Sequence, residues 1–209
     1  MSFKILKDDR ELELFRDYAE RYISVRFPLD YLQKSKVVAY YSEEGRMCGG
    51  YAFVLKPPFR VIESLPEFVR KRSEALRKVS MESLFEFTGL WLSPEIRCRR
   101  IASRFWFQIY RDILTLGKSH FVYAYSLDKP ALGKLYSICR PDVIFQGETK
   151  ILAGMKRAEN ESVEMSSLAR VAVAPLLRPQ LLTRRLLGGE RHLEKKIRIY
   201  DPAIREAEL

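Results

Sequence analysis

One stretch of eleven residues decides the fold: it runs from Leu92 to Ala102 and reads LSPEIRCRRIA. It follows an almost continuously apolar segment, 83–92, which is typical of a strand covered on both faces. It leads into residues 101–116, whose apolar side chains recur at helical spacing. A strand that runs directly into a helix presents free backbone N–H groups and the positive end of the helix dipole, so this junction favours a bound anion.

Three arginines add positive charge to the junction, since Arg97, Arg99 and Arg100 fall within four residues of one another. A pyrophosphate, or the phosphate of a phosphopantetheine arm, would fit such a site because arginine forms charge-assisted hydrogen bonds with phosphate oxygens. The alternative is that these arginines form only the solvated start of a helix. Residue types alone leave both interpretations open.

The segments on either side of the junction predict further helices and strands. Asp8 or Asp9 can cap a helix that reaches about Ser24. Apolar spacing and turn residues predict strands at 36–41, 47–55, 120–125 and 143–151, and helices at 65–78 and 129–138. This order of elements predicts a mixed α/β fold.

The junction and the elements after it resemble the GNAT (Gcn5-related N-acyltransferase) superfamily. That superfamily carries a strand–loop–helix motif of the form V-x-P-x-x-R-x-x-G-x-G/A. Leu92, Pro94, Arg97 and Ala102 fall in its register, with leucine replacing the valine. The resemblance covers residues 36–155 and implies an α/β protein with a central mixed, mostly antiparallel sheet flanked by helices.

On this resemblance we expect a core over residues 1–160 and a basic, partly helical segment over 161–209 that completes or covers it. The resemblance also implies that a thioester donor binds at Leu92, Arg97, Arg99, Arg100, Ile101, Ala102 and Ser103. Arg100 stands where the superfamily has its first loop glycine, which lets the backbone approach the phosphates. The Arg100 side chain could crowd the phosphates or bind one of them, and both possibilities stay open.

A second resemblance narrows the expected activity. Residues 86–92, which read EFTGLWL, are similar to the E-x-S-R-x-x-V strand of acyl-homoserine-lactone synthases and N-acyl amino acid synthases. Those enzymes take long acyl chains from acyl carrier protein. Gly89 replaces the arginine of that pattern, so a lactone synthase that uses S-adenosylmethionine is not expected. Gly147 and the pair Gly154-Met155 also resemble this group.

Two residues are candidates for proton transfer. Glu86 lies in a strand otherwise made of leucine, phenylalanine and tryptophan, where desolvation would raise its pKa towards that of a general base. The alternative is a glutamate that faces outward or forms a salt bridge. Tyr136 ends the segment LGKLY, which resembles a later helix of the superfamily whose tyrosine protonates the leaving thiolate. Its alternative is an ordinary tyrosine packed on a helix.

The predicted function is therefore an N-acyltransferase that moves an acyl group from acyl-coenzyme A, or from acyl-phosphopantetheine on acyl carrier protein, to a small amine. A long acyl chain and an amino-acid-like acceptor are expected. The net charge of +10 suits an acidic carrier protein. The alternative is a non-catalytic GNAT-like module that binds carrier protein, anionic lipid or nucleic acid. Nucleic acid is disfavoured but not excluded, because the basic residues are spread over several segments.

Cysteine and histidine spacing predicts no metal site, because the three cysteines are scattered and the two histidines stand alone. No apolar run approaches the ~18 residues that indicate a membrane span. The first residues do not form the charged-then-apolar pattern of a secretory signal. A cytoplasmic protein without metal is therefore expected.

Overall fold

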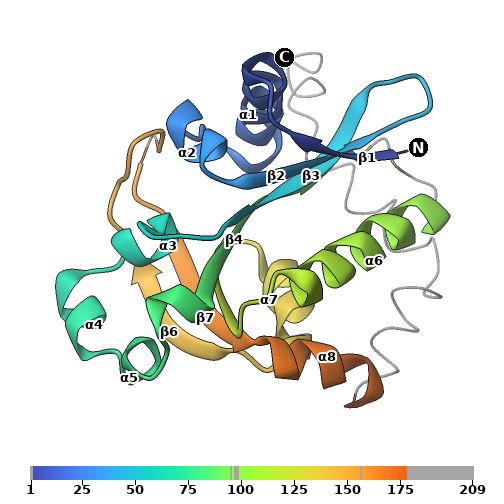
Figure 1. The fold of residues 1–209 in the computed structure, drawn as a ribbon. Helices are drawn as coiled ribbons and strands as arrows, with labels where there is room; N and C mark the ends of the chain where they lie inside the picture. Colours follow the sequence, from blue (N-terminus) through green and yellow to red (C-terminus); the bar gives the residue numbers. More distant parts are fainter. Residues whose placement is uncertain (1, 95, 97–98, 156, 178–209) are drawn as a thin grey trace, which may run out of the picture.

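The structure is a computed structural model, which describes residues 2–94, 96, 99–155 and 157–177. In this part of the chain, seven strands form one sheet in the order β1-β2-β3-β4-β5-β7-β6, with helices on both faces (Figure 1). β4 and β5 form a parallel pair, and the other neighbouring strands are antiparallel. The predicted mixed α/β class with a mostly antiparallel sheet is confirmed.

The elements have the following bounds. The strands are β1 (Ser2–Leu6), β2 (Lys36–Tyr41), β3 (Met47–Val54), β4 (Leu84–Leu92), β5 (His120–Ser126), β6 (Asp142–Glu148) and β7 (Asn160–Ser167). The helices are α1 (Asp9–Ile23), α2 (Leu29–Gln33), α3 (Arg60–Glu63), α4 (Glu67–Arg72), α5 (Glu74–Arg77), α6 (Arg99–Thr115), α7 (Pro130–Tyr136) and α8 (Leu168–Leu177). Two short 3-10 helices are η1 (Met81–Ser83) and η2 (Ser137–Cys139).

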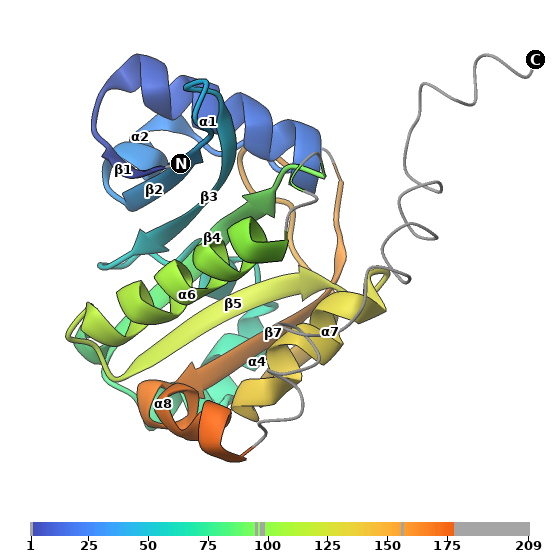
Figure 2. The same cartoon turned by 90° about the vertical axis from the view of Figure 1, so that its right-hand side faces the viewer.

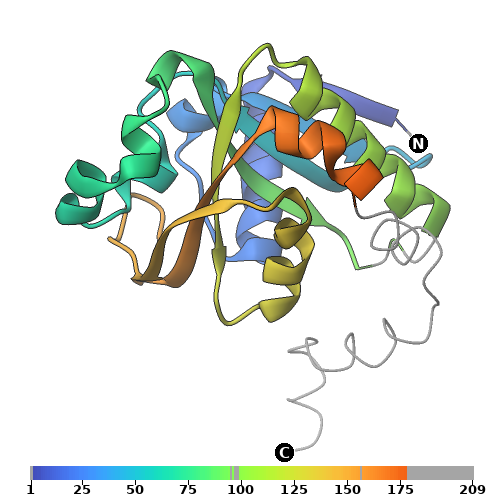
Figure 3. The same cartoon turned by 90° about the horizontal axis from the view of Figure 1, so that it is seen from below.

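Two layers of helices enclose the sheet (Figures 2 and 3). α6, α7 and α8 cover one face, where Phe85 and Phe121 of the sheet pack in a core with Phe105 of α6. α1 to α5 cover the other face, where Phe15 of α1 packs near Trp91. None of the described helices has the length and apolar character needed to cross a membrane.

Helix α1 forms where the sequence predicts it, because both ends carry local signals. The Asp8 side chain caps its first turn by accepting hydrogen bonds from the N–H groups of Arg10 and Glu11. Ser24 ends the helix in the left-handed conformation with φ of 62°. The N-cap side chain therefore comes from Asp8, the first of the two predicted alternatives.

The predicted helix over 65–78 is wrong, since this region forms separate short helices. Pro66 is the N-cap of α4 and starts a new helix. Ser73 ends α4 in an extended conformation, and its hydroxyl then accepts the N–H of Leu76 to start α5. The predicted strand at 143–151 ends earlier, at Glu148.

Strands β1 and β7 were not predicted, and β7 matters for the site. It lies between β5 and β6 in the sheet, although it follows both in the chain. The boundary expected between residues 160 and 161 thus falls inside this strand. Beyond it, α8 packs beside α6 on the same face (Figure 3). Residues 178–209 of the expected C-terminal segment lie outside the described residues.

Candidate functional site

The parallel strands β4 and β5 separate part of the way along their length. They pair where Leu84–Glu86 faces His120–Val122, and their later residues diverge (Figure 2). A cavity of about 310 Å³ lies at this gap, between the two faces of the sheet. Its size is at the lower end of the range of about 300–1,000 Å³ that is usual for small-molecule sites. The splayed strands thus provide a place for a ligand inside the sheet.

A β-bulge in β4 shapes the cavity wall. Gly50 of β3 pairs with Trp91 and Ala52 with Thr88, so the single residue between them on β3 faces two residues on β4. One of these is Gly89, whose φ of +63° suits glycine. Such a bulge leaves backbone groups without a ladder partner. These groups and the open edge of β4 can offer N–H donors to a ligand in the gap.

Glu86 lies in the cavity wall on the face that α2 and α3 cover, and only 1% of it is exposed. The hydroxyl of Tyr31 donates to its Oε1 at 2.7 Å, and the N–H of Val61 donates to its Oε2 at 3.3 Å. Burial raises the pKa of Glu86 to about 7, although these hydrogen bonds and the charge of Arg60 act to lower it. Glu86 can therefore exchange a proton near neutral pH.

The loop between β6 and β7, residues 149–159, closes the same side of the cavity with Leu152 and Met155 (Figure 1). The N–H of Arg26 donates to the carbonyl oxygen of Gly154 at 3.3 Å. A Cβ at Gly154 would lie 1.8 Å from the Arg26 carbonyl oxygen, and the φ of +86° also suits glycine. Only glycine therefore allows this close approach.

Charged groups also line this side of the cavity. Glu161 of β7 is half-buried, and loss of solvent raises its pKa. The Thr149 hydroxyl donates to its Oε2 at 2.9 Å. Arg60 of α3 lies in the same wall as Glu86, with its guanidinium 5.4 Å from the centre of the Tyr31 ring. This side therefore combines carboxylates with one guanidinium.

Tyr136 lies in the opposite wall, at the end of α7. Its ring centre lies 4.6 Å from that of Tyr123 and 5.5 Å from that of Tyr125. The two residues that the sequence singled out for proton transfer therefore line one cavity, and they approach it from opposite faces of the sheet. Tyr136 is half-buried, so its side chain is also packed against the core.

The predicted donor-binding residues do not all meet at the cavity. Leu92 lines it, while Ile101 packs against the core beneath α6 and Ala102 is half-buried. Arg100 and Ser103 instead line a separate depression beside Phe3 and Tyr40. Arg97 lies outside the described residues, and Arg99 is described only as the first residue of α6.

Several lining residues were missed by sequence reasoning. Arg60 lines the cavity and comes from an element far from β4 in the chain, as does Tyr31, which binds Glu86, and no local pattern marks either of them. Trp91 and Trp106 also line the cavity. The pair Gly154-Met155 was the available signal for the loop. Within the described ranges, no group of histidine, cysteine and acidic residues is arranged to hold a metal ion.

Comparison of the sequence with protein-family models found no match, and comparison with curated proteins found none either. Solved structures do match. FeeM, an N-acyl amino acid synthase from uncultured soil microbes, has a TM-score of 0.60 at 11% identity, covering 85% of this chain and 95% of its own. Arabidopsis thaliana NAA60 in complex with a bisubstrate analogue has a TM-score of 0.53 at 11% identity, covering 79% of this chain and 98% of its own.

The spermidine N-acetyltransferase from Vibrio cholerae, in complex with CoA and spermine, is a third match. Its TM-score is 0.51 at 10% identity, covering 82% of this chain and 97% of its own. Likeness at these identities shows the fold. The chain has the fold of the GNAT superfamily, and the expected superfamily fold is confirmed.

Proposed function

We propose that this chain, which has the GNAT fold, is an N-acyltransferase that moves an acyl group from a pantetheine thioester to an amine. One observation carries the proposal: Glu86, with a pKa of about 7, and Tyr136 line the same cavity at the gap between β4 and β5. A base and an acid on opposite sides of a cavity can serve the two ends of one transfer reaction.

Direct transfer accounts for both groups. An acceptor ammonium first loses one proton to solvent, and Glu86 then accepts a proton from the neutral amine as the nitrogen lone pair attacks the thioester carbonyl carbon. A C–N bond forms, the tetrahedral intermediate collapses, and the C–S bond breaks with its electron pair going to sulfur. Tyr136 gives its hydroxyl proton to the thiolate. The products are an amide and a free thiol, and solvent restores the protonation of both side chains.

The donor would lie along the gap. Unpaired N–H groups of β4 near the Gly89 bulge would bind the thioester oxygen, which becomes negative during the reaction. The start of α6 would bind a phosphate of the donor. Arg100 lines the depression beside β1 and β2 rather than the cavity. This position supports the proposal, because a phosphate could reach the start of α6 without colliding with the Arg100 side chain. Leu92, Trp106 and Leu132 would form an apolar wall for the acyl chain.

The acceptor would bind on the Glu86 side, and we propose an amino-acid-like molecule. Arg60 lies in the same wall as Glu86, and arginine binds carboxylates through paired, charge-assisted hydrogen bonds. An amino acid presents an ammonium and a carboxylate on one carbon, so it could use both residues. The likeness to FeeM, an N-acyl amino acid synthase, supports the same acceptor class.

We further propose that the donor is a long acyl chain on acyl carrier protein, with acyl-coenzyme A as the other candidate. The apolar wall supports a long chain, and the net charge of +10 supports encounter with an acidic carrier. Charge-steered encounter weakens with salt, since the Debye length falls to ~8 Å at physiological ionic strength.

Thiol release tests the proposal directly. The protein is incubated with acetyl, medium and long acyl donors, on coenzyme A and on carrier protein, with amino acids or simple amines, across a salt series. We expect release with long donors and amino acids, with a carrier preference that disappears at high salt. Salt-indifferent use of acyl-coenzyme A would remove only the carrier proposal. Binding of donor without release under any condition would instead support the non-catalytic binding module.

A further inference from the structure

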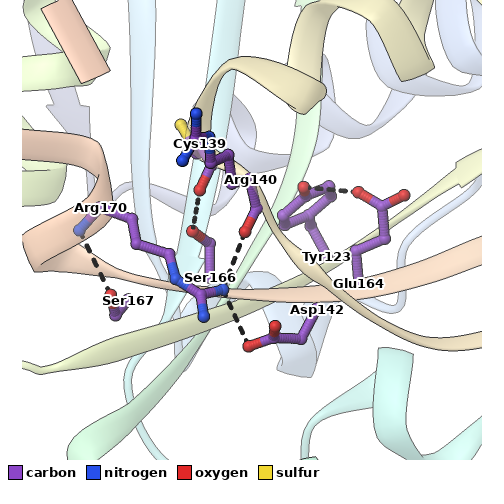
Figure 4. A network of polar contacts seen from close by, with 8 residues as sticks. All are labelled: Tyr123, Cys139, Arg140, Asp142, Glu164, Ser166, Ser167 and Arg170. Carbon is purple, nitrogen blue, oxygen red and sulfur yellow. Dashed lines mark hydrogen bonds and ion pairs between the residues drawn. The ribbon is translucent and has the colours of Figure 1, made fainter. Parts of the chain in front are cut away.

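A second buried glutamate lies on the opposite face of the sheet from Glu86. Glu164 of β7 is 4% exposed, and it does not line the cavity. Its carboxylate accepts the hydroxyls of Tyr123 at 2.7 Å, Tyr125 at 2.8 Å and Ser162 at 3.0 Å. Figure 4 shows the bond from Tyr123. Three hydroxyl donors occupy most of the acceptor sites of one carboxylate.

The two tyrosines that Glu164 binds are those that contact Tyr136. The ring of Tyr123 lies 4.6 Å from the Tyr136 ring, and the ring of Tyr125 lies 5.5 Å from it. Tyr123 also pairs with Glu164 across the β5–β7 ladder. Each phenol is thus fixed at both ends, by its strand and by the carboxylate. The Tyr136 ring consequently packs on two rings that cannot turn independently.

The backbone that follows Tyr136 is held by hydrogen bonds from β7 and α8. The Ser166 hydroxyl donates to the carbonyl oxygen of Cys139 at 3.2 Å. The Arg170 guanidinium donates to the carbonyl oxygen of Arg140 at 2.8 Å and to Asp142 at 2.9 Å (Figure 4). β7 and α8 therefore secure the ring of Tyr136 and the chain directly after it.

We propose that Glu164 is a positioning residue for Tyr136: by fixing Tyr123 and Tyr125, it keeps the Tyr136 hydroxyl directed at the leaving thiol. This inference rests on the proposed function, in which Tyr136 supplies a proton. A proton donor acts only within hydrogen-bond reach, and small misplacements of a reacting group cost much of the rate. Without Glu164, the buried hydroxyl of Tyr123 and the half-buried hydroxyl of Tyr125 lose their acceptor, and the two rings can reorient.

The chain provides a matched control in Asp112 of α6. It is also buried, at 8% exposed, and accepts the hydroxyl of Tyr51 at 2.8 Å and the amide of Gln108 at 2.8 Å. Neither partner lines the cavity. Asp112→Ala therefore removes a comparable tyrosine-bound carboxylate on the same face, but away from Tyr136.

A double-mutant cycle with Tyr136→Phe tests the proposal. Tyr136→Phe should lower kcat by about 10²-fold, and Glu164→Ala by about tenfold with little change in donor KM. The double variant should be no slower than Tyr136→Phe alone. Glu164→Gln, whose amide oxygen can still accept hydroxyl hydrogen bonds, should recover part of kcat. Asp112→Ala should leave kcat unchanged to within about twofold, as a distant site does.

A purely structural Glu164 would give independent effects that multiply in the double variant, and this result overturns the proposal. A second readout does not depend on turnover: 3-fluorotyrosine placed at position 136 reports the ring by ¹⁹F NMR. We expect one narrow resonance in the wild type and in Asp112→Ala, and a broadened or divided one in Glu164→Gln. If Tyr136→Phe keeps full activity, the acid role of Tyr136 in the proposed function fails. The NMR result then still tests the positioning role, which is overturned if the resonance is unchanged in Glu164→Gln.

Discussion

Glu86 and Glu164 are buried on opposite faces of one sheet, and each accepts a tyrosine hydroxyl at 2.7 Å. Glu86 accepts the hydroxyl of Tyr31 and the backbone N–H of Val61, and it lines the cavity. Glu164 has three hydroxyls and lies behind the cavity wall. Both carboxylates are buried, so what distinguishes them is the cavity, which a ligand could enter and which Glu86 alone of the two lines.

The largest expected effect tests Glu86, the carboxylate that lines the cavity. Glu86→Gln should lower turnover by about 10²–10⁴-fold, because a positioned general base is lost. Donor affinity should change little, since Glu86 faces the acceptor side. In the wild type, kcat/KM should rise with pH through about 7 as Glu86 loses its proton, and the variant should lack this rise. Steady-state kinetics from acid to alkaline pH measures both, and a normal profile in the variant would make Glu86 structural.

Stability against pH gives the next largest effect. In the folded protein the pKa of Glu86 is about 7, which is above its ordinary value of 4.5. Between pH 4.5 and pH 7 the folded protein therefore keeps a proton on Glu86 that the unfolded chain has released. Stability therefore falls as pH rises through this window, by at most about 3 kcal/mol from this group. Urea unfolding at several pH values should show that Glu86→Gln lacks this loss. Parallel curves for the two proteins would contradict the raised pKa.

A smaller effect comes from the tyrosine that holds Glu86. Tyr31→Phe removes a donor to the charged carboxylate, so the pKa of Glu86 should rise further. A hydrogen bond to a charged group corresponds to a shift of about one to two units. The rise in kcat/KM should therefore move to higher pH. Tyr22→Phe, whose hydroxyl instead contacts Ser93, is the control and should leave the profile in place.

The smallest expected effect separates the acceptor side from the donor side. Gly154→Ala places a Cβ against the Arg26 carbonyl, so the 149–159 loop must shift. The acceptor KM should rise by about 5- to 30-fold, which corresponds to the 1–2 kcal/mol cost of a left-handed residue. The donor KM should stay constant. Gly117→Ala has a similar φ of +69° with nothing near its Cβ, so it should affect stability alone.

The sequence predicted the elements whose signals are local. The apolar run before Leu92 and the helical spacing after it indicated β4 and α6, and Asp8 marked the start of α1. β7 escaped prediction because Ser162 and Glu164 place polar groups on a covered face. The tyrosine hydroxyls that bind Glu164 come from β5, about forty residues earlier, and only the tertiary structure brings these groups together.

The residues of the candidate site also divide into those that a local sequence signal marks and those that it does not. Glu86 and Tyr136 could be found because each lies in a short motif that resembles a superfamily pattern. Arg60, which lines the cavity, and Tyr31, which binds Glu86, could not, since both lie in short helices with no motif of their own. Arg100 fell in the motif, yet it lines a different depression, because a register in sequence does not set the direction of a side chain.

The position of β7 has a consequence for how the protein is made. A ribosome releases the N-terminal part of a chain first, so β5 and β6 emerge before the strand that must enter between them. Until β7 has been synthesised as far as residue 167, β5 and β6 each have an unpaired edge. Unpaired edges can pair with strands of other chains. The ring that is proposed to protonate the thiol gains its support only then, so a nascent chain that stops short of β7 is expected to bind donor poorly or release no product.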